Sequence, residues 1–539
     1  MTVTRRLRTA TAATALLLAG AGLTAGTVET ASAAAGCRST VPGDVNGDGH
    51  AEVAIGASAA PDNFSGAVHV LYGRRGGLVA DAAGTALDDQ YFAQSTPGVP
   101  GDPSTFGEID SFGDAVQFGD FNADGCADLA IGAPGETKTA GSVTVLYGSP
   151  RGLTTSGARV FTTTSLFGAG QSETCVEDPV SLPEEDPIYH CESFGRSLAV
   201  GDLDGDGVDD LAVGAPEKDL GGQPYVGAVA VLFGDRAGLD QGATPAALVT
   251  RDTAGVPGVA TGYDNFGTAL TTGDFDDNGR DELAVGFRGV DGAGLVEIIG
   301  GTATGFGSIS GTEITQDTAG VPGAAEPDDE FGTALAAGDV TGDGRADLVV
   351  GVPGEQSGEA HGSVVLLKGS ADGLTGSGSQ RWTTRSPGVA GSAGGFGSGL
   401  TIGPLDADRY ADLAVTAIGG ASGSGSVTLL RGSATGLTTA GAGGRRFDQN
   451  TPGIPGTPQR HEGFGAATAT AYVQSGRQAS LIIAAPFRKV HGKTTAGLVH
   501  QLAISPDGPD ARRTRTFDPD SPGVKGKVVN QYVFGASVG

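Results

Sequence analysis

Small, apolar and polar residues alternate in short stretches along most of the chain, a pattern that predicts many short β-strands. The stretch FGTALTTGD, at 266–274, shows the first of four recurring parts. A tight acidic loop follows it, then an apolar stretch such as DLAVGAP at 210–216 and an alternating stretch such as GSVTVLYG at 141–148. A weaker fourth stretch ends at a turn such as DTAGVPG at 252–258. Each unit therefore predicts four strands of one antiparallel sheet.

These parts recur in the same order, which makes internal repetition the main evidence for the fold. The repeats start near residues 36, 112, 194, 266, 331, 396 and 464, and each start after the first is a Phe-Gly pair. A four-stranded sheet cannot cover its own faces, and radial packing of several sheets avoids exposed edges. We therefore expect an all-β, seven-bladed β-propeller of four-stranded antiparallel blades. An open solenoid is the alternative, but it would need distinct capping repeats at its ends.

The two ends of the repeat array are complementary. The first unit begins GCRSTVPGDVNGDG at 36–49 and lacks a Phe-Gly pair, whereas the chain ends with FGASVG at 534–539. We expect this C-terminal strand to complete the first blade and close the ring. The predicted domain organisation is a single propeller domain over residues 36–539.

Residues 1–35 have the features of a secretory signal peptide. Arg5, Arg6 and Arg8 precede the apolar run TAATALLLAGAGLTAG at 11–26 and the small residues ASAAAG at 31–36. The apolar run is shorter than the roughly 20 residues that a membrane-spanning helix needs. We therefore predict a secreted, extracellular protein without a membrane span. The adjacent arginines allow a twin-arginine export route, and the route stays open.

The formal net charge of −29 restricts the partners of the chain. Nucleic acid and anionic membranes both require a basic surface, so we expect neither as a partner. Part of the acidity is typical of a solubilising surface. We expect a monomer that binds an extracellular protein or glycan.

The acidic loops between the first and second strands carry the candidate chemistry. Five of them share a pattern of oxygen-bearing residues at positions 1, 3, 5 and 9 and a glycine at position 6. The residues at positions 1, 3, 5, 7 and 9 are Asp44, Asn46, Asp48, His50 and Glu52 in loop 1; Asp120, Asn122, Asp124, Cys126 and Asp128 in loop 2; Asp202, Asp204, Asp206, Val208 and Asp210 in loop 3; Asp274, Asp276, Asn278, Arg280 and Glu282 in loop 4; and Asp339, Thr341, Asp343, Arg345 and Asp347 in loop 5.

This pattern predicts about five Ca²⁺ sites. Calcium takes six to eight oxygen ligands, which side chains at positions 1, 3, 5 and 9 and the backbone carbonyl of position 7 can supply. The glycine at position 6 permits the sharp turn. Acidic turns also arise for solubility, but five occurrences at one phase of a repeat favour metal binding. Without cations, the crowded carboxylates would repel one another.

The last two units depart from the pattern. The sequence GPLDADRYADL at 403–413 has Pro404 at position 1 and Arg409 at position 6, and AYVQSGRQASL at 471–481 has no acidic residue. We expect no metal in these two loops, here called loops 6 and 7. Because the fold tolerates such units, we expect each calcium ion to brace its own blade.

Four cysteines in an exported chain are expected to form disulfides. Cys175 and Cys191 bracket an insertion, which favours a bridge between them and leaves Cys37 to pair with Cys126. The other connectivities stay open.

The Phe-Gly pairs, the DxDxDGxxD loops and the Gly-Ala-Pro triplets at 132–134 and 214–216 resemble the FG-GAP repeat family. That family includes the seven-bladed propeller of integrin α ectodomains and many exported bacterial proteins, and the resemblance covers roughly residues 36–539. It implies calcium in the acidic loops on one face of the ring and a ligand on the opposite face. The insertion at 162–193, rich in Asp and Glu, would lie on the ligand face, where it suits a cationic or metal-bridged partner or is merely solvated.

No catalytic motif emerges from the sequence. GASVG at 535–539 matches a nucleophile elbow in letters, but no helix can follow it at the chain end. We therefore expect a binding, adhesion or scaffold module that is not an enzyme. The alternative is an extracellular hydrolase or lyase whose site lies in the central depression of the propeller.

Overall fold

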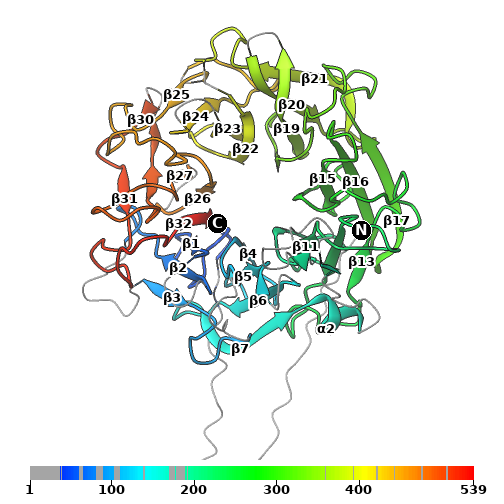
Figure 1. Cartoon of the computed structure of the whole chain (residues 1–539), viewed down its shortest axis with the longest axis horizontal. Coiled ribbons are helices and arrows are strands. Elements are labelled where there is room, and N and C mark those ends of the chain that lie inside the picture. Colours follow the sequence, from blue (N-terminus) through cyan, green and yellow to red (C-terminus); the bar gives the residue numbers. More distant parts are fainter. Residues whose placement is uncertain are drawn as a thin grey trace, which may run out of the picture. The chain divides into compact units, whose positions relative to one another are not determined.

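Seven four-stranded antiparallel sheets are arranged as the blades of a ring in the computed structural model (Figure 1). This confirms the predicted seven-bladed β-propeller. The structure describes residues 37–539 except 38, 60–64, 80–88, 102–109, 137–139, 169–175, 178–188, 191, 358–359, 392–393, 420–422, 442, 475–477 and 506–507. The predicted signal peptide and the predicted Cys175–Cys191 bridge lie outside these residues. The strands belong to one compact unit over residues 36–539.

Each blade runs from an innermost strand at the ring centre to an outer edge strand. Blade 1 contains β32 (Phe534–Val538), β1 (Val53–Ala57), β2 (Ala67–Leu71) and β3 (Gln90–Phe92). Blade 2 contains β4 (Ala115–Gly119), β5 (Asp128–Ala133), β6 (Ser142–Tyr147) and β7 (Thr154–Phe161). Blade 3 contains β10 (Ser197–Gly201), β11 (Asp210–Ala215), β12 (Ala228–Leu232) and β13 (Ala247–Val249).

The remaining blades follow the same plan. Blade 4 contains β14 (Ala269–Gly273), β15 (Glu282–Phe287), β16 (Leu295–Thr302) and β17 (Gly305–Ile314). Blade 5 contains β18 (Leu335–Gly338), β19 (Asp347–Ser357), β20 (Ala360–Lys368) and β21 (Thr375–Thr383). Blade 6 contains β22 (Phe396–Gly403), β23 (Asp412–Ala417), β24 (Ser426–Leu430) and β25 (Arg446–Phe447). Blade 7 contains β26 (Thr468–Ala471), β27 (Ser480–Ala484), β28 (Val499–Leu502) and β31 (Arg515–Phe517).

Among the described residues, two short hairpins and a helix lie outside the blades. The hairpins are β8 (Val176–Glu177) with β9 (Tyr189–His190), and β29 (Ile504–Ser505) with β30 (Gly508–Pro509). The helix is α2 (Thr163–Phe167), at the start of the insertion that the sequence predicted to be a loop. The helix begins there because Thr162 and Ser165 form a reciprocal capping box.

Apolar contacts between neighbouring blades form the core. The second strands β1, β5, β11, β15, β23 and β27 are buried at every residue, because a neighbouring blade covers each face. Each of seven hydrophobic clusters joins residues of two adjacent blades. Radial packing therefore buries both faces of every sheet, as the repeat pattern requires.

The Phe-Gly pairs lie at the contacts between neighbouring blades. All seven phenylalanines are fully buried, and the N–H of Phe112 donates to the carbonyl of Ser65 in the preceding blade at 2.9 Å. Gly113 follows with a φ of +91°, and a Cβ there would lie 2.7 Å from the carbonyl oxygen of Ala67. A side chain at this position would push the two blades apart, which explains why the pair recurs.

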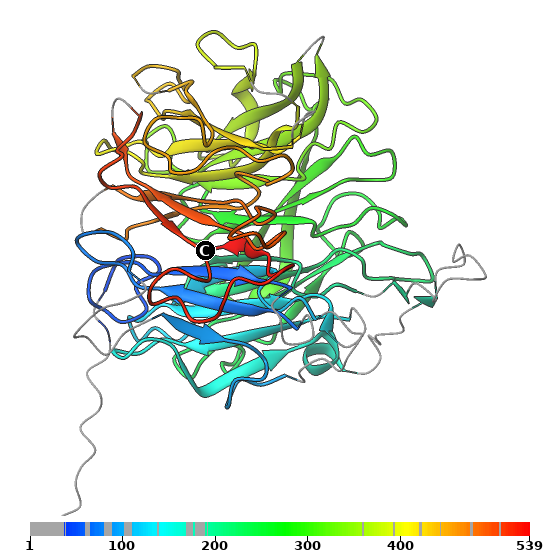
Figure 2. The same ribbon diagram turned by 60° about the vertical axis from the view of Figure 1, so that its left-hand side comes forward.

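The C-terminal strand closes the ring, as predicted. Strand β32 pairs with β1, and Ala54 and Gly539 exchange two backbone hydrogen bonds of 3.0 Å. Figure 2 shows this red strand beside the blue strands of blade 1. The predicted disulfide between Cys37 and Cys126 is also present and links the loops of blades 1 and 2. None of the helices in the described part of the chain has the length and apolar character to cross a lipid bilayer.

Candidate functional site

The antiparallel topology separates the connections of each blade onto two faces. We call the face with the acidic loops, which join first to second strands, the lower face. The connections between second and third strands, and those from each blade to the next, lie on the opposite, upper face. All five predicted loops are where the sequence placed them, directly before β1, β5, β11, β15 and β19.

The first aspartate of each acidic loop shapes the turn. In loop 3, Asp202 accepts hydrogen bonds from the backbone N–H groups of Gly205, Asp206 and Gly207 at 2.8 to 3.0 Å. The equivalent aspartates take N–H groups from positions 5 and 6 of loops 1, 2, 4 and 5. The predicted residues at positions 1, 3, 5 and 9 therefore belong to one wrapped turn in each loop.

The acid at position 9 lies at the base of its loop. Asp210 accepts the N–H of Leu203 and the N–H of Gly234, both at 2.8 Å. Burial raises the pKa of Asp210 and of Asp128 to about 8. Burial likewise raises the pKa of Glu282 to about 7 and holds that of Glu52 well above its usual range. Burial is the main cause of these raised pKa values, and the neighbouring carboxylates of each loop raise them further.

Two loops bring three carboxylates close together. In loop 3, Asp202, Asp204 and Asp210 each offer an oxygen, and these oxygens lie within 4.8 Å of one another. Asp274, Asp276 and Glu282 form the same arrangement in loop 4. Loops 1, 2 and 5 have an uncharged oxygen donor, Asn46, Asn122 or Thr341, at position 3. Hard oxygen donors grouped in this way fit a calcium ion.

Loop 6 contains a cation of its own, which the sequence analysis missed. The guanidinium of Arg431 lies 2.9 Å from Asp406 and 2.6 Å from Asp412, which occupy positions 3 and 9. Only 8 % of the Arg431 side chain is exposed. Burial still raises the pKa of Asp412 to about 6, although Arg431 opposes this shift. The sequence predicts no metal in this loop, and the structure supplies a reason.

Arg431 directly follows β24, the third strand of blade 6, and is therefore distant from loop 6 in the sequence. Arg431 directly precedes the glycine whose N–H binds the acid at position 9, Gly432. Tyr72, Tyr147, Phe233 and Lys368 occupy the same place in blades 1, 2, 3 and 5. An arginine at this one place is therefore visible in an alignment of the repeats, but only after strand pairing has been assigned.

Seven backbone hydrogen bonds join the lower-face loops into a closed circle. In each bond, the N–H at position 8 of one loop donates to the carbonyl at position 1 of the preceding loop, over 2.8 to 3.4 Å. The donor and acceptor pairs are Ala51 and Tyr472, Ala127 and Asp44, Asp209 and Asp120, Asp281 and Asp202, Ala346 and Asp274, Ala411 and Asp339, and Ala479 and Pro404. Each loop therefore touches its neighbours as well as its own blade.

Two further carboxylates strengthen this circle and were also missed. Asp209 accepts the N–H of Asp120 at 2.7 Å, and Asp281 accepts the N–H of Asp202 at 3.0 Å. Both residues stand at position 8, immediately before the predicted ligand. Position 8 is alanine in the other loops, so the repeat pattern did not mark it as a polar position.

The upper face carries the exposed apolar side chains. Among the described residues, the large hydrophobic side chains that are exposed are Val259, Tyr263, Val290, Ile418 and Phe487. All of them lie in upper-face connections. They are distributed over the connections of blades 3, 4, 6 and 7, so each offers a separate apolar contact on this face.

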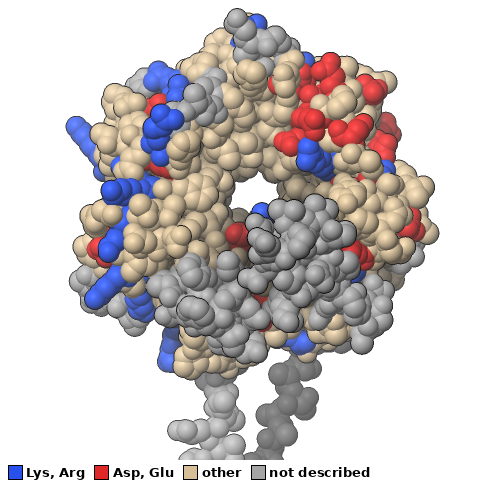
Figure 3. Space-filling view, viewed as in Figure 1, with Lys and Arg blue, Asp and Glu red and all other residues tan. Residues whose placement is uncertain are grey.

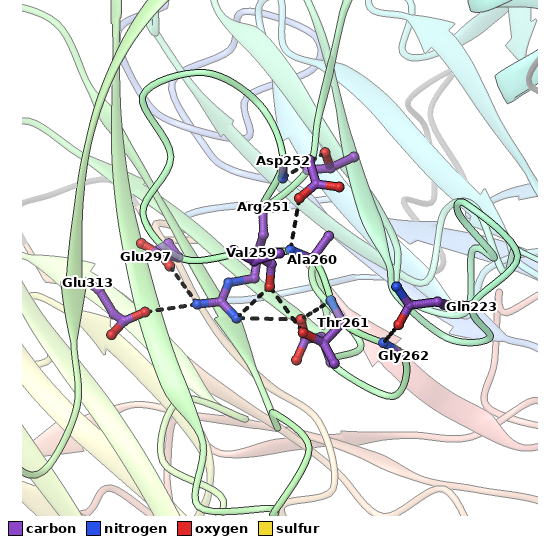
Figure 4. Close-up of polar contacts among 11 residues, drawn as sticks. Gln223, Arg251, Asp252, Val259, Ala260, Thr261, Gly262, Glu297 and Glu313 are labelled. Atoms are coloured by element: carbon purple, nitrogen blue, oxygen red, sulfur yellow. Dashed lines mark hydrogen bonds and ion pairs between the residues drawn. The ribbon is translucent and has the colours of Figure 1, made fainter.

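The upper-face connection of Val259 and Tyr263 is held in place by polar contacts, which Figure 4 shows. Arg251 donates to the Val259 carbonyl at 3.3 Å and lies 2.9 Å from Glu313. It also lies 3.6 Å from Glu297, whose pKa burial raises to about 8. The N–H of Gly262 donates to the side chain of Gln223 at 2.9 Å. These contacts preform the surface that Val259 and Tyr263 present.

The central channel is lined by the innermost strands. Small, apolar and hydroxyl-bearing side chains predominate there, including those of Ala115, Ser197, Leu270 and Thr468. Among the described lining residues, Asp114 is the charged one, and it pairs with Arg196 at 2.8 Å.

Four segments match the FG-GAP repeat family, at residues 38–71, 112–146, 194–232 and 331–366. The chain is 32 % identical over 177 residues to a phosphatidylinositol-glycan-specific phospholipase D of Rattus norvegicus, an alignment that covers 31 % of this chain and 17 % of that protein. It is 38 % identical over 124 residues to integrin alpha-PS2 of Drosophila melanogaster, covering 21 % and 8 % of the two chains. With integrin alpha-5 of Xenopus laevis it shares 32 % identity over 182 residues, covering 32 % and 14 %.

The chain thus spans less than a fifth of the length of these relatives. A solved structure described as the Dos1 propeller covers 74 % of this chain and 68 % of that one, at a TM-score of 0.35 and 11 % identity, too distant to inform the site. The matched repeats and the ring of seven blades agree with each other. The chain therefore carries FG-GAP repeats within a seven-bladed β-propeller, and parts of it are similar to integrin α chains.

Proposed function

We propose that this chain is a secreted FG-GAP propeller, braced by calcium, that acts as a binding, adhesion or scaffold module for an extracellular protein or glycan. The acidic loops of the lower face hold about five Ca²⁺ ions, and the upper face meets the partner. Bound calcium supplies the positive charge that the crowded carboxylates lack.

Arg431 is the observation that carries the calcium proposal. Loop 6 has lost its first ligand, and there the protein places a buried guanidinium between the acids at positions 3 and 9. Loops 1 to 5 keep the acids, and no cation among the described residues pairs with their position-9 acids, although the half-buried Arg345 of loop 5 lies 3.6 Å from Asp343. In this proposal, Arg431 takes the place in loop 6 that a calcium ion takes in loops 1 to 5. Blades 1 to 6 can therefore have the same sheet geometry.

The disulfide supports secretion. Cys37 and Cys126 are bonded, and disulfides persist mainly in oxidising, extracellular compartments. Two sets of residues support binding on the upper face: the exposed apolar side chains there, and the contacts of Arg251 that fix one of the connections. A preformed surface costs little ordering entropy when a partner binds.

An enzymatic role in the central channel is the alternative, and the name of the phospholipase D relative is its main support. Hydrolysis of glycosidic bonds by the common route needs two carboxyl groups across the scissile bond. The described lining offers one, Asp114, and Arg196 already pairs with it. We therefore favour binding over catalysis.

Calcium titration of the purified chain by isothermal calorimetry tests the proposal. We expect about five bound ions per chain in the wild type and about four in Asp202→Asn. Binding of no calcium, or of the same number by both proteins, would remove the proposed brace. Turnover of esters, phosphodiesters or polysaccharides that Asp114→Asn abolishes would replace the binding role by the enzymatic one.

A further inference from the structure

The basic residues of this acidic chain are concentrated near its C-terminus. Residues 441–539 contain 12 of the 33 Lys and Arg residues but only 6 of the 62 Asp and Glu residues, a local net charge of +6 against −29 overall. Figure 3 shows the result on the ring: Lys and Arg gather over blades 6 and 7, and Asp and Glu gather over blades 4 and 5.

Four of the chain's seven lysines lie in the upper-face connections of blade 7. Lys489 and Lys493 lie between β27 and β28, and Lys525 and Lys527 lie between β31 and β32. We call these four residues the basic platform. All four are exposed. Within the described part of the chain, none of their ammonium groups lies within 4.0 Å of a carboxylate, although the backbone N–H of Lys525 donates to Asp89 at 2.6 Å.

The two connections that carry the basic platform are fixed to each other. Val490, Ala496 and Val528 pack together beneath them. The N–H of Thr494 donates to Asn530 at 3.1 Å, and the N–H of Gln531 returns a bond to the Thr494 carbonyl at 2.9 Å. The lysine ammonium groups are therefore presented by a rigid base.

Two acidic residues beside the platform, Asp89 and Asp520, are already engaged, and Asp89 binds His69 at 3.1 Å and the backbone N–H of Lys525 at 2.6 Å. Asp520 lies 3.0 Å from Nδ1 of His491 and accepts the N–H of Val528 at 2.9 Å. These bonds, with the nearby charge of Lys527, hold the pKa of Asp520 below its usual range. The platform therefore keeps its positive charge for an external partner.

The composition of the platform favours a flexible, hydrated polyanion. Protein interfaces are depleted in lysine and enriched in arginine and aromatic residues, unlike these four positions. A flat anionic membrane would also meet the acids of the same face, Asp291, Glu326, Asp328 and Glu330. A long duplex nucleic acid requires a continuous basic track, which a chain of net charge −29 does not offer over blades 4 and 5.

We propose that the basic platform of blade 7 binds an anionic polysaccharide, one that carries uronate or sulfate groups along a flexible chain. This inference rests on the proposed binding role of the upper face and names the partner for one sector of it. The exposed side chain of Phe487, 49 % accessible, lies in the same connection as Lys489 and Lys493 and offers an apolar surface beside the charges.

Surface plasmon resonance with immobilised heparin and alginate tests the proposal in calcium buffer. We expect the wild type to bind at least one of them, and to bind roughly 50-fold more weakly when NaCl rises from about 50 to about 200 mM, as for four ionic contacts. The variant Lys489→Gln/Lys493→Gln/Lys527→Gln should lose at least about tenfold in affinity.

The matched control removes three exposed arginines from lower-face hairpins, Arg75→Gln/Arg151→Gln/Arg236→Gln, and should bind like the wild type. An equal loss of affinity in both variants, or no polysaccharide binding by the wild type, would contradict the proposal that the basic platform is the binding site. Tighter binding to duplex DNA, to phosphatidylserine vesicles or to polyglutamate would overturn the choice of partner. Calcium stoichiometry is measured separately, so a failure of the brace is distinguishable from a failure of the platform.

Discussion

Loops 3 and 6 have the same fold but balance their charge in different ways. Asp202, Asp204 and Asp210 crowd together in loop 3 without a basic partner among the described residues. In loop 6 the two buried or half-buried acids share Arg431. The comparison teaches that crowded acids in this turn can be balanced by a side chain, and under the proposed function an ion does the same in loop 3. We therefore expect a blade to depend on calcium only where its acids lack a cation from the protein.

Removal of calcium should show the largest effect, because it acts on loops 1 to 5 at once. At a concentration one hundred times Kd, each site adds about 2.7 kcal/mol. With an unfolding entropy of about 2.1 cal/mol/K per residue, five sites correspond to a drop in Tm of roughly 13 °C. Scanning calorimetry with excess chelator and with restored calcium measures it. A Tm that ignores chelation would contradict the proposed difference between the loops.

The substitution Arg431→Gln should be next in size. It leaves Asp406 and Asp412 without their cation, and breaking such a buried pair costs about 3 to 5 kcal/mol. Calorimetry should show a Tm several degrees lower, by the same amount with and without calcium. Arg409→Gln is the control, because Arg409 is exposed and stacks on Tyr410. An equal effect of both substitutions would mean that Arg431 has no special role.

Asp210→Asn and Asp412→Asn change the same position 9 in the two loops. Asp210→Asn should lower Tm by roughly 3 °C in calcium, the value of one lost site, and by less than about 1 °C in chelator. Asp412→Asn should act equally in both buffers, since its partner is Arg431. Thermal melts in the two buffers separate the variants. A calcium-independent loss in Asp210→Asn would remove the distinction.

A conversion of loop 6 into a metal loop should have the smallest effect on stability. Pro404→Asp restores position 1, Arg409→Gly restores position 6, and Arg431→Tyr removes the internal cation in favour of the residue found in blades 1 and 2. Calorimetric titration should count one more calcium ion than in the wild type, with a similar Tm in calcium. An unchanged count in a folded variant would show that other features of loop 6 prevent binding.

The repeated parts of the sequence were enough to predict the blades, because Phe-Gly pairs and alternating strands are local patterns. The same holds for the acidic loops and for the closure by residues 534–539. The bridge between Cys37 and Cys126 was expected as the remaining pair once Cys175 and Cys191 were paired, and it is present. Arg431 was not predicted, since it lies 19 residues from Asp412 and reaches it only through the pairing of β23 with β24.

The basic platform was not predicted from the sequence, for a related reason. A net charge of −29 describes the whole chain, whereas the connections that carry Lys489 and Lys527 lie side by side because β32 returns to blade 1 and brings its connection beside that of β27 and β28. Global charge says nothing about a local surface that the topology assembles from separate segments. The role of the acids in the insertion at 162–193 stays a prediction, because most of them fall outside the described residues, and the described Glu192 is buried and paired with Lys218.

The seven backbone bonds that run from loop to loop have a mechanical consequence. A row of such contacts in an open array would have two ends, and fraying would begin at either of them. A circle has none, so in the proposed calcium-bound state a loop that loses its ion remains tethered on both sides, either by loops that keep their ions or by loops 6 and 7, for which no ion is expected. We therefore expect the circle of lower-face loops to stay folded when only some of the calcium ions are lost. As free calcium falls further, the loops should unfold together in one sharp transition.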